Sequence, residues 1–506
     1  MTSNRRARLG RILLASGFAG LLALAACDKG PDKAETAAEI KSGVEGQLKK
    51  LEGSSARKVI SHSAVNVTAQ DDGAYLVSIE GLKIQPAPDG YLEIGTVSYL
   101  AKPKDEKSYE VSDLKLPATM PFKELDGKER GKLALTTKAF SGLWSKELSA
   151  FQTLDGTFTD IAATDDKGGD VRVASATFTN ALADKGGGLF DAIGNVVLSD
   201  FTAKDTGGGV FSVAEARLDG KYDSVKLVDY QAAVAKYQEL TVKQVALAEQ
   251  GTPPPPSPSP EDQKALTDAI TTMAASVKGG DFKIALKGLK YGDGASEPFT
   301  MGSLTIGTLI DGINQEKATL AFDIAHQELV LAMDEMSNPI NQAALPSSGN
   351  LSLKVTDIPS KDMVKVLADN LPGVASSDAS MAEANAMAML VALNAVFQSS
   401  GAKIEVAPSQ LVSKLMELKA DGNFSVTSQS LYGLVGALNV AIRGLDDLVA
   451  LAQQTPDHSE SQQAIGAAGM LQQYSQREQG ADGKPVDKFK IEINEAGQIL
   501  VNGKPI

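Results

Sequence analysis

Apolar and polar residues alternate along most of the chain between residues 58 and 220, and short runs rich in Asp and Gly separate the alternating stretches. A period of two is typical of β-strands that bury one face, and Asp and Gly favour the turns between them. Three stretches resemble one another, namely Val65–Leu82, Phe158–Phe178 and Leu198–Leu218. Each is predicted to form a strand, a tight turn and a second strand, so this region reads as a series of hairpins.

Glycines occupy the tips of these predicted hairpins. Gly73, the pair Gly168 and Gly169, and the run 207–209 can supply the positive φ that a reversing chain needs. A fourth, looser copy of the pattern spans Leu289–Ile306. Because hairpins recur along the chain, we expect an α+β fold dominated by β-structure, and their irregular spacing argues against a propeller or a β-helix. The long antiparallel, twisted sheet of the expected fold would be built of repeated hairpins and would carry several packed helices.

The alternation returns in the second half of the chain. Phe282, Ile284 and Leu286 alternate with lysines and an alanine, and the segment 351–355 places three aliphatic residues at every second position. Both segments are predicted to be strands with one buried face.

Helices are predicted where the apolar positions recur every three to four residues. The predicted helices span residues 36–52, 227–250, 261–277, 361–371, 381–397 and 462–476. The segment Leu434–Ile442 is compatible with either a strand or a helix. The chain is predicted to end in a hairpin formed by Lys488–Ile493 and Gln498–Val501.

The first 26 residues have the organisation of an export signal. Four arginines precede an apolar segment, Ile12–Leu24, which is shorter than the roughly 20 residues that a helix needs to span a bilayer. The segment Leu24-Ala25-Ala26-Cys27 resembles the lipobox of bacterial lipoproteins. This resemblance implies that Cys27 is acylated and that the chain is cleaved before it. In the enterobacterial lipoproteins that it resembles, aspartate at the next position implies retention at the inner membrane, so Asp28 favours the inner membrane over the outer.

A run of six prolines in nine residues, TPPPPSPSP at positions 252–260, interrupts the chain. Proline lacks the N–H that a helix or an inner strand requires, so this run is predicted to be a stiff connector. The predicted organisation is therefore a signal peptide (1–26), a tether (27–35), an N-terminal β-rich half that ends in a helix (36–251), a linker (252–260) and a C-terminal β-rich half with apolar helices (261–506).

Composition narrows the possible partners. The chain has 506 residues and a formal net charge of −14, which argues against a nucleic-acid partner because nucleic acids require a basic surface. Cleavage before Cys27 would remove four arginines and no acidic residue, so the charge would fall from −14 to −18. Anionic headgroups would repel a mature protein with this negative charge, so the lipid anchor would have to hold it at the membrane.

No arrangement of residues points to a catalytic centre or to a cofactor. The three histidines, His62, His326 and His458, are far apart, and the chain has neither a phosphate-binding loop nor a nucleophile elbow. Acidic clusters at 71–72 and 165–170 contain oxygen ligands of the kind that calcium prefers, but Asp and Gly are also the residues that tight turns require. We therefore predict a protein that is not an enzyme, with no metal site and no cofactor.

The predicted helix Met381–Phe397 is apolar nearly all round, which requires burial on most sides. It would either pack on the concave face of the sheet as core or act as a lid over an apolar groove. In the second case, the candidate ligand contacts are Met387, Leu390, Leu393 and Phe397, because flexible thioethers and aliphatic groups adapt to acyl chains.

Three local features resemble bacterial envelope proteins of the YdgA-like type and, more distantly, AsmA-like proteins. They are the strand and helix at Gly349–Leu371, the apolar helix that follows, and the closing segment FKIEINEAGQILVNGKPI. The resemblance covers mainly residues 280–506. It implies an elongated, twisted sheet with an apolar inner face and, for the AsmA-like group, phospholipid movement between membranes. The lipobox departs from that group, which has a transmembrane helix in its place.

Two functions follow from these features. The first is a non-enzymatic lipoprotein at the periplasmic face of a bacterial membrane, which binds a hydrophobic, lipid-like ligand or helps to transfer it. The alternative is a structural or adaptor module for another envelope protein. A continuous apolar trough would favour the first, and a filled core with an exposed apolar patch would favour the second.

Overall fold

A computed structural model of the chain describes residues 33–54, 57–87, 90–249, 259–293, 298–332, 338–374, 379–455 and 459–505. The predicted signal peptide, Cys27 and most of the proline run lie outside the described residues. The chain divides into two compact units. The first contains residues 1–207 and 225–254, and the second contains residues 208–224 and 255–506.

The described part of the first unit contains helix α2, a set of antiparallel strands and helix α3. Its elements are α2 (Lys33–Leu51), β1 (Gly53–Ser54), β2 (Arg57–Lys58), β3 (Ile60–Ser61), β4 (Ala64–Ala69), β5 (Tyr75–Ala87), β6 (Gly90–Asp105), β7 (Ser108–Lys115), β8 (Thr119–Glu124), β9 (Glu129–Ser145), β10 (Ala150–Asp165), β11 (Asp170–Gly186), β12 (Leu189–Lys204) and α3 (Leu227–Glu249).

The second unit begins with β13, whose last two residues belong to the first unit. Its elements are β13 (Val210–Lys226), α4 (Pro260–Ala275), β14 (Gly279–Gly292), β15 (Phe299–Asp311), β16 (Ala318–Gln327), β17 (Val330–Leu331), α5 (Pro339–Ala344), β18 (Ser348–Ile358), α6 (Ser360–Val374), α7 (Ala379–Gln398), β19 (Lys403–Val412), β20 (Glu417–Val426), β21 (Leu434–Arg443), α8 (Leu445–Gln454), α9 (Ser459–Tyr474), β22 (Gln476–Gln479), β23 (Pro485–Ile493), β24 (Ile499–Val501) and β25 (Lys504–Pro505).

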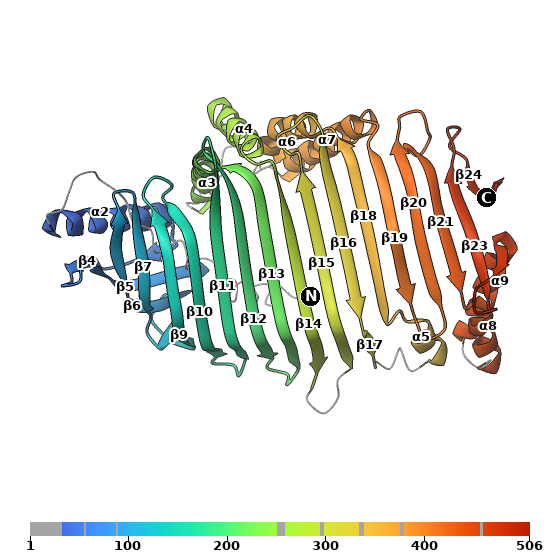
Figure 1. Cartoon of the computed structure of the whole chain (residues 1–506), viewed down its shortest axis with the longest axis horizontal. Coiled ribbons are helices and arrows are strands. Elements are labelled where there is room, and N and C mark those ends of the chain that lie inside the picture. Colours follow the sequence, from blue (N-terminus) through green and yellow to red (C-terminus); the bar gives the residue numbers. More distant parts are fainter. Residues whose placement is uncertain are drawn as a thin grey trace. The chain divides into compact units, whose positions relative to one another are not determined.

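The strands of each unit form a long antiparallel sheet in which neighbours in sequence are mostly neighbours in space (Figure 1). In the second unit the order runs from β13 to β16, then through β18, β19, β20 and β21 to β23. The predicted β-dominated α+β fold with a long antiparallel sheet is therefore confirmed. The ambiguous segment 434–442 is strand β21, and the short helices α5 and α8 were not predicted.

Helix α2 covers the apolar face of the first strands. Ile40, Val44 and Leu48 recur every four residues, so they lie on one side of the helix, and each is at most 1% exposed. They belong to a core that also contains Val77 and Ile79 of β5, both fully buried. The core of the first unit is thus a helix packed on a sheet.

The turns between the hairpins have the chemistry that the sequence predicted. Gly73 and Gly168 have φ values of 81° and 85°, and Gly208 has a φ of 87°. At two of these turns the carboxylate before the glycines accepts hydrogen bonds from turn amides: Asp165 Oδ1 accepts from Gly169 N at 2.7 Å, and Asp205 Oδ1 accepts from Gly207 N at 2.8 Å.

A second repeated feature lies inside the strands. Several left-handed residues inside the strands have an apolar residue two positions before them and one position after. They include Gly81, Asp113, Asp160, Asp200, Gly288 and Asp357. At Gly81 the register with β6 shifts by one residue, as in a β-bulge. Ile79 and Leu82 are three residues apart, yet both are at most 1% exposed in the same core. The bulge therefore returns the later apolar residue to the inner face.

We expect Asp113→Gly to leave the free energy of unfolding of the first unit unchanged or slightly higher, because Gly adopts a φ of 54° without strain. In contrast, Asp113→Val should lower it by about 1–2 kcal/mol, because a β-branched side chain is strained in this region. Trp144 is the only tryptophan and is 3% exposed in the first unit, so its fluorescence during urea unfolding reports the change. Glu110→Val, at an exposed position of the same strand, is the control, and an equal loss there would refute the argument.

Tyr99 offers a second test of this core. It is fully buried, its hydroxyl has no hydrogen-bond partner, and burial raises its pKa well above the usual range. An unsatisfied buried hydroxyl is destabilising, so we expect Tyr99→Phe to raise the free energy of unfolding by about 1 kcal/mol. The control is Tyr109→Phe, because the hydroxyl of Tyr109 is not both buried and without a partner. A loss of stability in Tyr99→Phe would contradict this account.

Candidate functional site

The two faces of the second sheet differ in chemistry. Residues directly opposite each other on neighbouring strands lie on the same face, so the register gives the composition of each face. In one row, Ile284 lies opposite Ile306, which in turn lies opposite Ile324 on the next strand. Ile324 then lies opposite Leu351. A second row continues through Leu353 of β18 to β19, β20, β21 and β23.

These rows define one surface, which we call the apolar face. It consists of Phe282, Ile284, Ile306, Ile310, Leu320, Phe322, Ile324, Leu351, Leu353, Val355, Ile404, Val406, Phe424, Leu438, Ile491 and Ile493. No charged residue belongs to these rows between β14 and β23.

The opposite face is polar. Lys283 and Asp323 belong to one of its rows, and Lys354 lies opposite Glu405 in the next. Asp421 on β20 is opposite Asn439, whose side-chain amide donates to it at 3.1 Å. This alternation of apolar and charged rows is what period-two strands produce when only one face avoids water.

The apolar face differs from an ordinary core because its side chains remain accessible. Every residue that defines it is half-buried or exposed, with Leu320 at 39%, Ile284 at 42% and Leu351 at 45% exposure. In the first unit, the equivalent positions under α2 are almost completely buried. The described part of the second unit thus has an uncovered apolar surface that spans strands β14 to β23.

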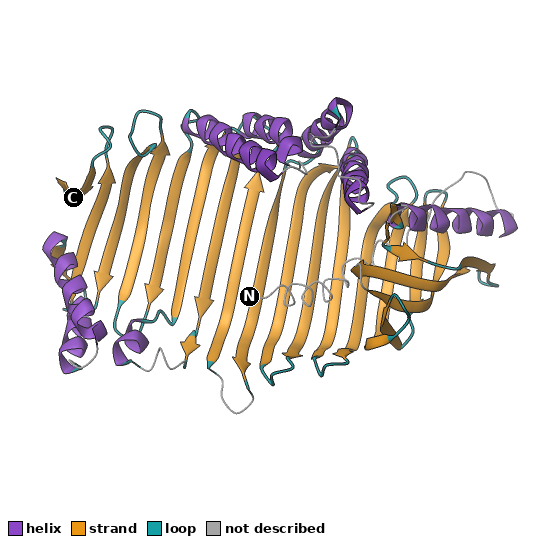
Figure 2. Ribbon diagram, turned by 180° about the vertical axis from the view of Figure 1, so that it is seen from behind, coloured by secondary structure: helices purple, strands orange, loops and turns teal. Residues whose placement is uncertain are grey.

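The helices of the second unit explain why this face stays open. In both views α4, α6 and α7 lie at one end of the strands, and most of the length of β15–β21 is seen without a helix in front (Figures 1 and 2). Helix α6 packs against α4 and α7. A small cluster around Ile340, Leu448 and Ala452 links α5 with α8. These helices therefore pack mainly on one another.

The four predicted ligand contacts all lie on α7. Met387 is 58% exposed and Leu390 is 56% exposed, whereas Leu393 and Phe397 are half-buried. Helix α7 was expected to be buried on most sides, but Val391 on the same turn as Leu390 is also 66% exposed. The structure places these residues at the end of the sheet, and the ligand-contact assignment stays a prediction.

An apolar face of the sheet was expected from the sequence, but the only ligand contacts predicted by residue were those on α7. The alternation at 282–286 and 351–355 correctly indicated strands with one apolar face, and the inference of burial followed because soluble proteins usually cover such faces. Whether a helix covers a strand depends on contacts between distant segments, which the local pattern does not contain.

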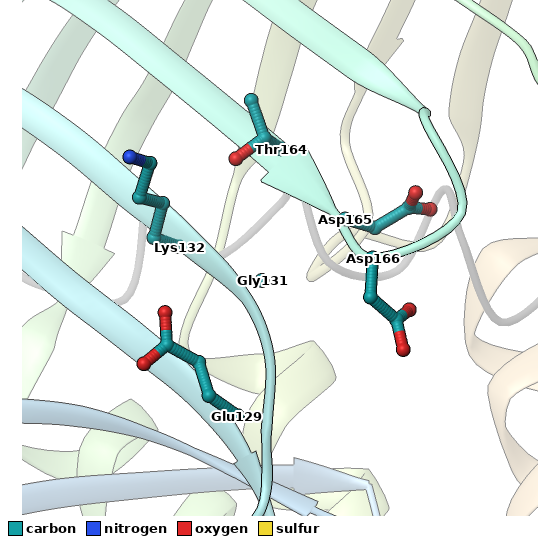
Figure 3. Close-up of a pocket in the computed structure, with 6 residues that line it drawn as sticks. All are labelled: Glu129, Gly131, Lys132, Thr164, Asp165 and Asp166. Carbon is teal, nitrogen blue, oxygen red and sulfur yellow. The ribbon is translucent and has the colours of Figure 1, made fainter.

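An open hollow with a volume of about 300 Å³ lies in the first unit, where β9 begins and β10 ends (Figure 3). Its carboxylates, from Glu129, Asp165 and Asp166, do not point at a common centre. Asp165 binds the amides of its own turn, and Asp166 accepts from Arg130 Nη1 at 2.8 Å. Arg130 also holds the pKa of Asp166 below its usual range. The carboxylates of Asp165 and Asp166 are thus engaged in turn and ion-pair contacts.

The two described histidines lie far apart in sequence and differ in their surroundings. His326 Nε2 lies 3.3 Å from the carbonyl oxygen of Pro346. His62 Nδ1 is buried without a hydrogen-bond partner, and it lies 3.9 Å from Glu52 Oε1. His458 lies outside the described residues. Within the described ranges, no group of three or more His, Cys, Asp or Glu side chains is arranged to hold a metal ion.

In comparisons with family models, curated proteins and solved structures, none matches this chain. Among the helices that the structure describes, none combines the length and the hydropathy needed to cross a membrane. The apolar face is therefore the feature on which an inference of function has to rest.

Proposed function

We propose that this protein binds the acyl chains of lipids on the apolar face of its second unit. It would do so as a non-enzymatic lipoprotein, anchored through Cys27 at the periplasmic side of a bacterial membrane, where it carries or transfers a lipid-like ligand. The observation that supports this proposal is the uncovered apolar face, which runs from β14 to β23 without a charged residue in its rows.

The energetics favour an apolar occupant. Each methylene that leaves water contributes about 0.8 kcal/mol, so about ten methylenes on the face would contribute roughly 8 kcal/mol before the entropy cost of binding. Exposed apolar surfaces of this extent mark interaction sites in soluble proteins. An acyl chain meets the requirement because it brings no polar group that would lose hydrogen bonds against Ile306, Ile324 or Leu353.

The dimensions also suit acyl chains. Strands are spaced about 4.8 Å apart, and a chain that fills half of a roughly 30 Å bilayer core is about 15 Å long. One acyl chain laid across the strands would therefore cover about three of them. The rows through Phe322 and Ile404 pass over more strands than this, so the face could hold several chains side by side.

The proposal predicts that a charge on the apolar face prevents lipid binding. Leu320 on this face and Leu309 on the polar face belong to neighbouring strands and are 39% and 37% exposed. Leu320→Glu should reduce the lipid that copurifies with the protein several-fold, because a carboxylate would lose its hydration next to acyl chains. Leu309→Glu, the matched control, should retain it. The measurement is mass spectrometry of an organic extract of each purified protein.

Equal lipid content in the two variants would contradict the proposal. If the unsubstituted protein carries no lipid and acquires none from vesicles, the face is not a lipid site, and the adaptor function becomes the better explanation. Unfolding curves of both variants establish that Leu320→Glu still folds.

The proposed anchor has a direct test of its own. Cells that express the protein in the presence of a labelled fatty acid should transfer the label to the wild-type chain, and Cys27→Ala should abolish the transfer, because Cys27 is the only thiol. Label on Cys27→Ala, or no label on the wild type, would refute acylation of Cys27. Separation of the two membranes on a density gradient tests whether Asp28 directs the chain to the inner one.

A further inference from the structure

Exposed apolar side chains gather at one end of the strands in the second unit. On α7, Met387, Leu390 and Val391 are 58%, 56% and 66% exposed. In the turn between β20 and β21, Leu431 is 82% exposed and Tyr432 is 54% exposed. We call these five residues the end patch. None of them belongs to the rows of the apolar face.

The two parts of the end patch are neighbours. A Cβ atom placed on Gly433, which follows Tyr432, would lie 3.3 Å from Nε2 of Gln398, the last residue of α7. At 1.5 Å per residue, Val391 lies only about 10 Å along the helix from that point. Both views show α7 and the β20–β21 turn at the same end of the strands (Figures 1 and 2).

The exposure of Leu431 results from a defined turn. Thr427 N donates to Gly433 O at 2.9 Å, and Gly433 N donates to Ser430 O at 2.9 Å. Ser430 itself is only 6% exposed. The backbone is thus fixed on both sides of Leu431 while its side chain points into solvent, at a cost that an apolar occupant would offset.

The distribution of charge indicates which kind of partner the end patch can bind. Helix α7 has one charged residue, Glu383, and the turn 427–433 has none, whereas the whole chain has a net charge of −14. Most of such an acidic protein is repelled by a membrane that contains anionic lipids. The end patch is a surface that can approach headgroups without bringing a cluster of carboxylates to them.

We propose that the end patch docks on the surface of a phospholipid bilayer. Leu431 and the α7 side chains would enter the boundary between headgroups and acyl chains, and Tyr432 would lie at the headgroup level, where tyrosine is enriched. This inference rests on the proposed lipid-binding function and adds the place of lipid exchange. Strands β18 and β19 connect to α6 and α7, so Val355 and Ile404 belong to the row of the apolar face nearest to the bilayer.

The test uses the full chain, acylated and reconstituted in phosphatidylcholine vesicles that contain a fraction of lipid spin-labelled on the acyl chain. A fluorophore is attached to Val391→Cys in one sample and to Val330→Cys in another. Val330, at the opposite end of the strands, is a matched control because it is also a valine and is 52% exposed. The unsubstituted chain, whose only thiol is Cys27, provides the background.

We expect the spin-labelled lipid to quench the probe at position 391 several-fold more than the probe at position 330. Leu431→Glu in the labelled Val391→Cys chain should reduce this quenching several-fold, because the turn and the helix dock together. Equal quenching at the two positions would overturn the proposal. A blue-shifted 391 probe in the absence of vesicles would also overturn it, because a second copy of the chain would then cover the patch.

The outcomes separate this proposal from the lipid-binding function. Leu320→Glu should lower the lipid content of the protein and leave the quenching at position 391 unchanged. Leu431→Glu should reduce the quenching at position 391 and leave the amount of lipid that is already bound unchanged. Quenching at position 391 in a protein that binds no lipid would refute the lipid-binding function. It would still support docking of the end patch on the bilayer.

Discussion

The antiparallel hydrogen-bond ladder is the constraint on which the rest of this structure depends. Successive side chains of a strand point to opposite faces, and the ladder aligns those faces from one strand to the next. A residue such as Ile306 is therefore placed beside Ile284 and Ile324 by backbone pairing alone. When every strand alternates in the same phase, the sheet acquires one apolar and one charged face along its whole width.

Long strands would lose this phase if the apolar spacing were not adjusted. The left-handed residues inside the strands, such as Gly81 and Asp113, make that adjustment. At each of them, two apolar residues that are three positions apart can lie on the same face. Ile79 and Leu82, on either side of Gly81, are an example. Gly accepts this conformation without strain, and Asp is among the few other residues that tolerate it, which is the physical reason that these two residue types recur there.

The two units differ in what happens to their apolar faces. In the first unit, α2 covers the face with Ile40, Val44 and Leu48, and the result is a dry core. In the described part of the second unit, the helices pack at the ends of the strands, and the face stays accessible. Contact between an apolar surface and water is unfavourable. The proposed acyl ligand would remove the apolar face from water, and the proposed bilayer would do the same for the end patch.

The sequence by itself determined the type and the approximate limits of most elements. The period of two in segments such as 351–355 and the Gly-rich turns at Gly73 and Gly168 are local signals, and local backbone sterics and side-chain alternation act on them directly. The lipobox at Cys27 is a local signal of the same kind, and its meaning stays a prediction.

Only the tertiary structure decided which apolar surfaces are covered. Helix α7 has more apolar residues than α2, yet α2 buries Ile40, Val44 and Leu48 on its sheet and α7 leaves Met387 and Val391 in solvent. The difference depends on where the chain returns in space, and contacts between residues far apart in sequence determine this. For that reason the sequence predicted the apolar face of the strands, whereas its exposure could be seen only in the fold.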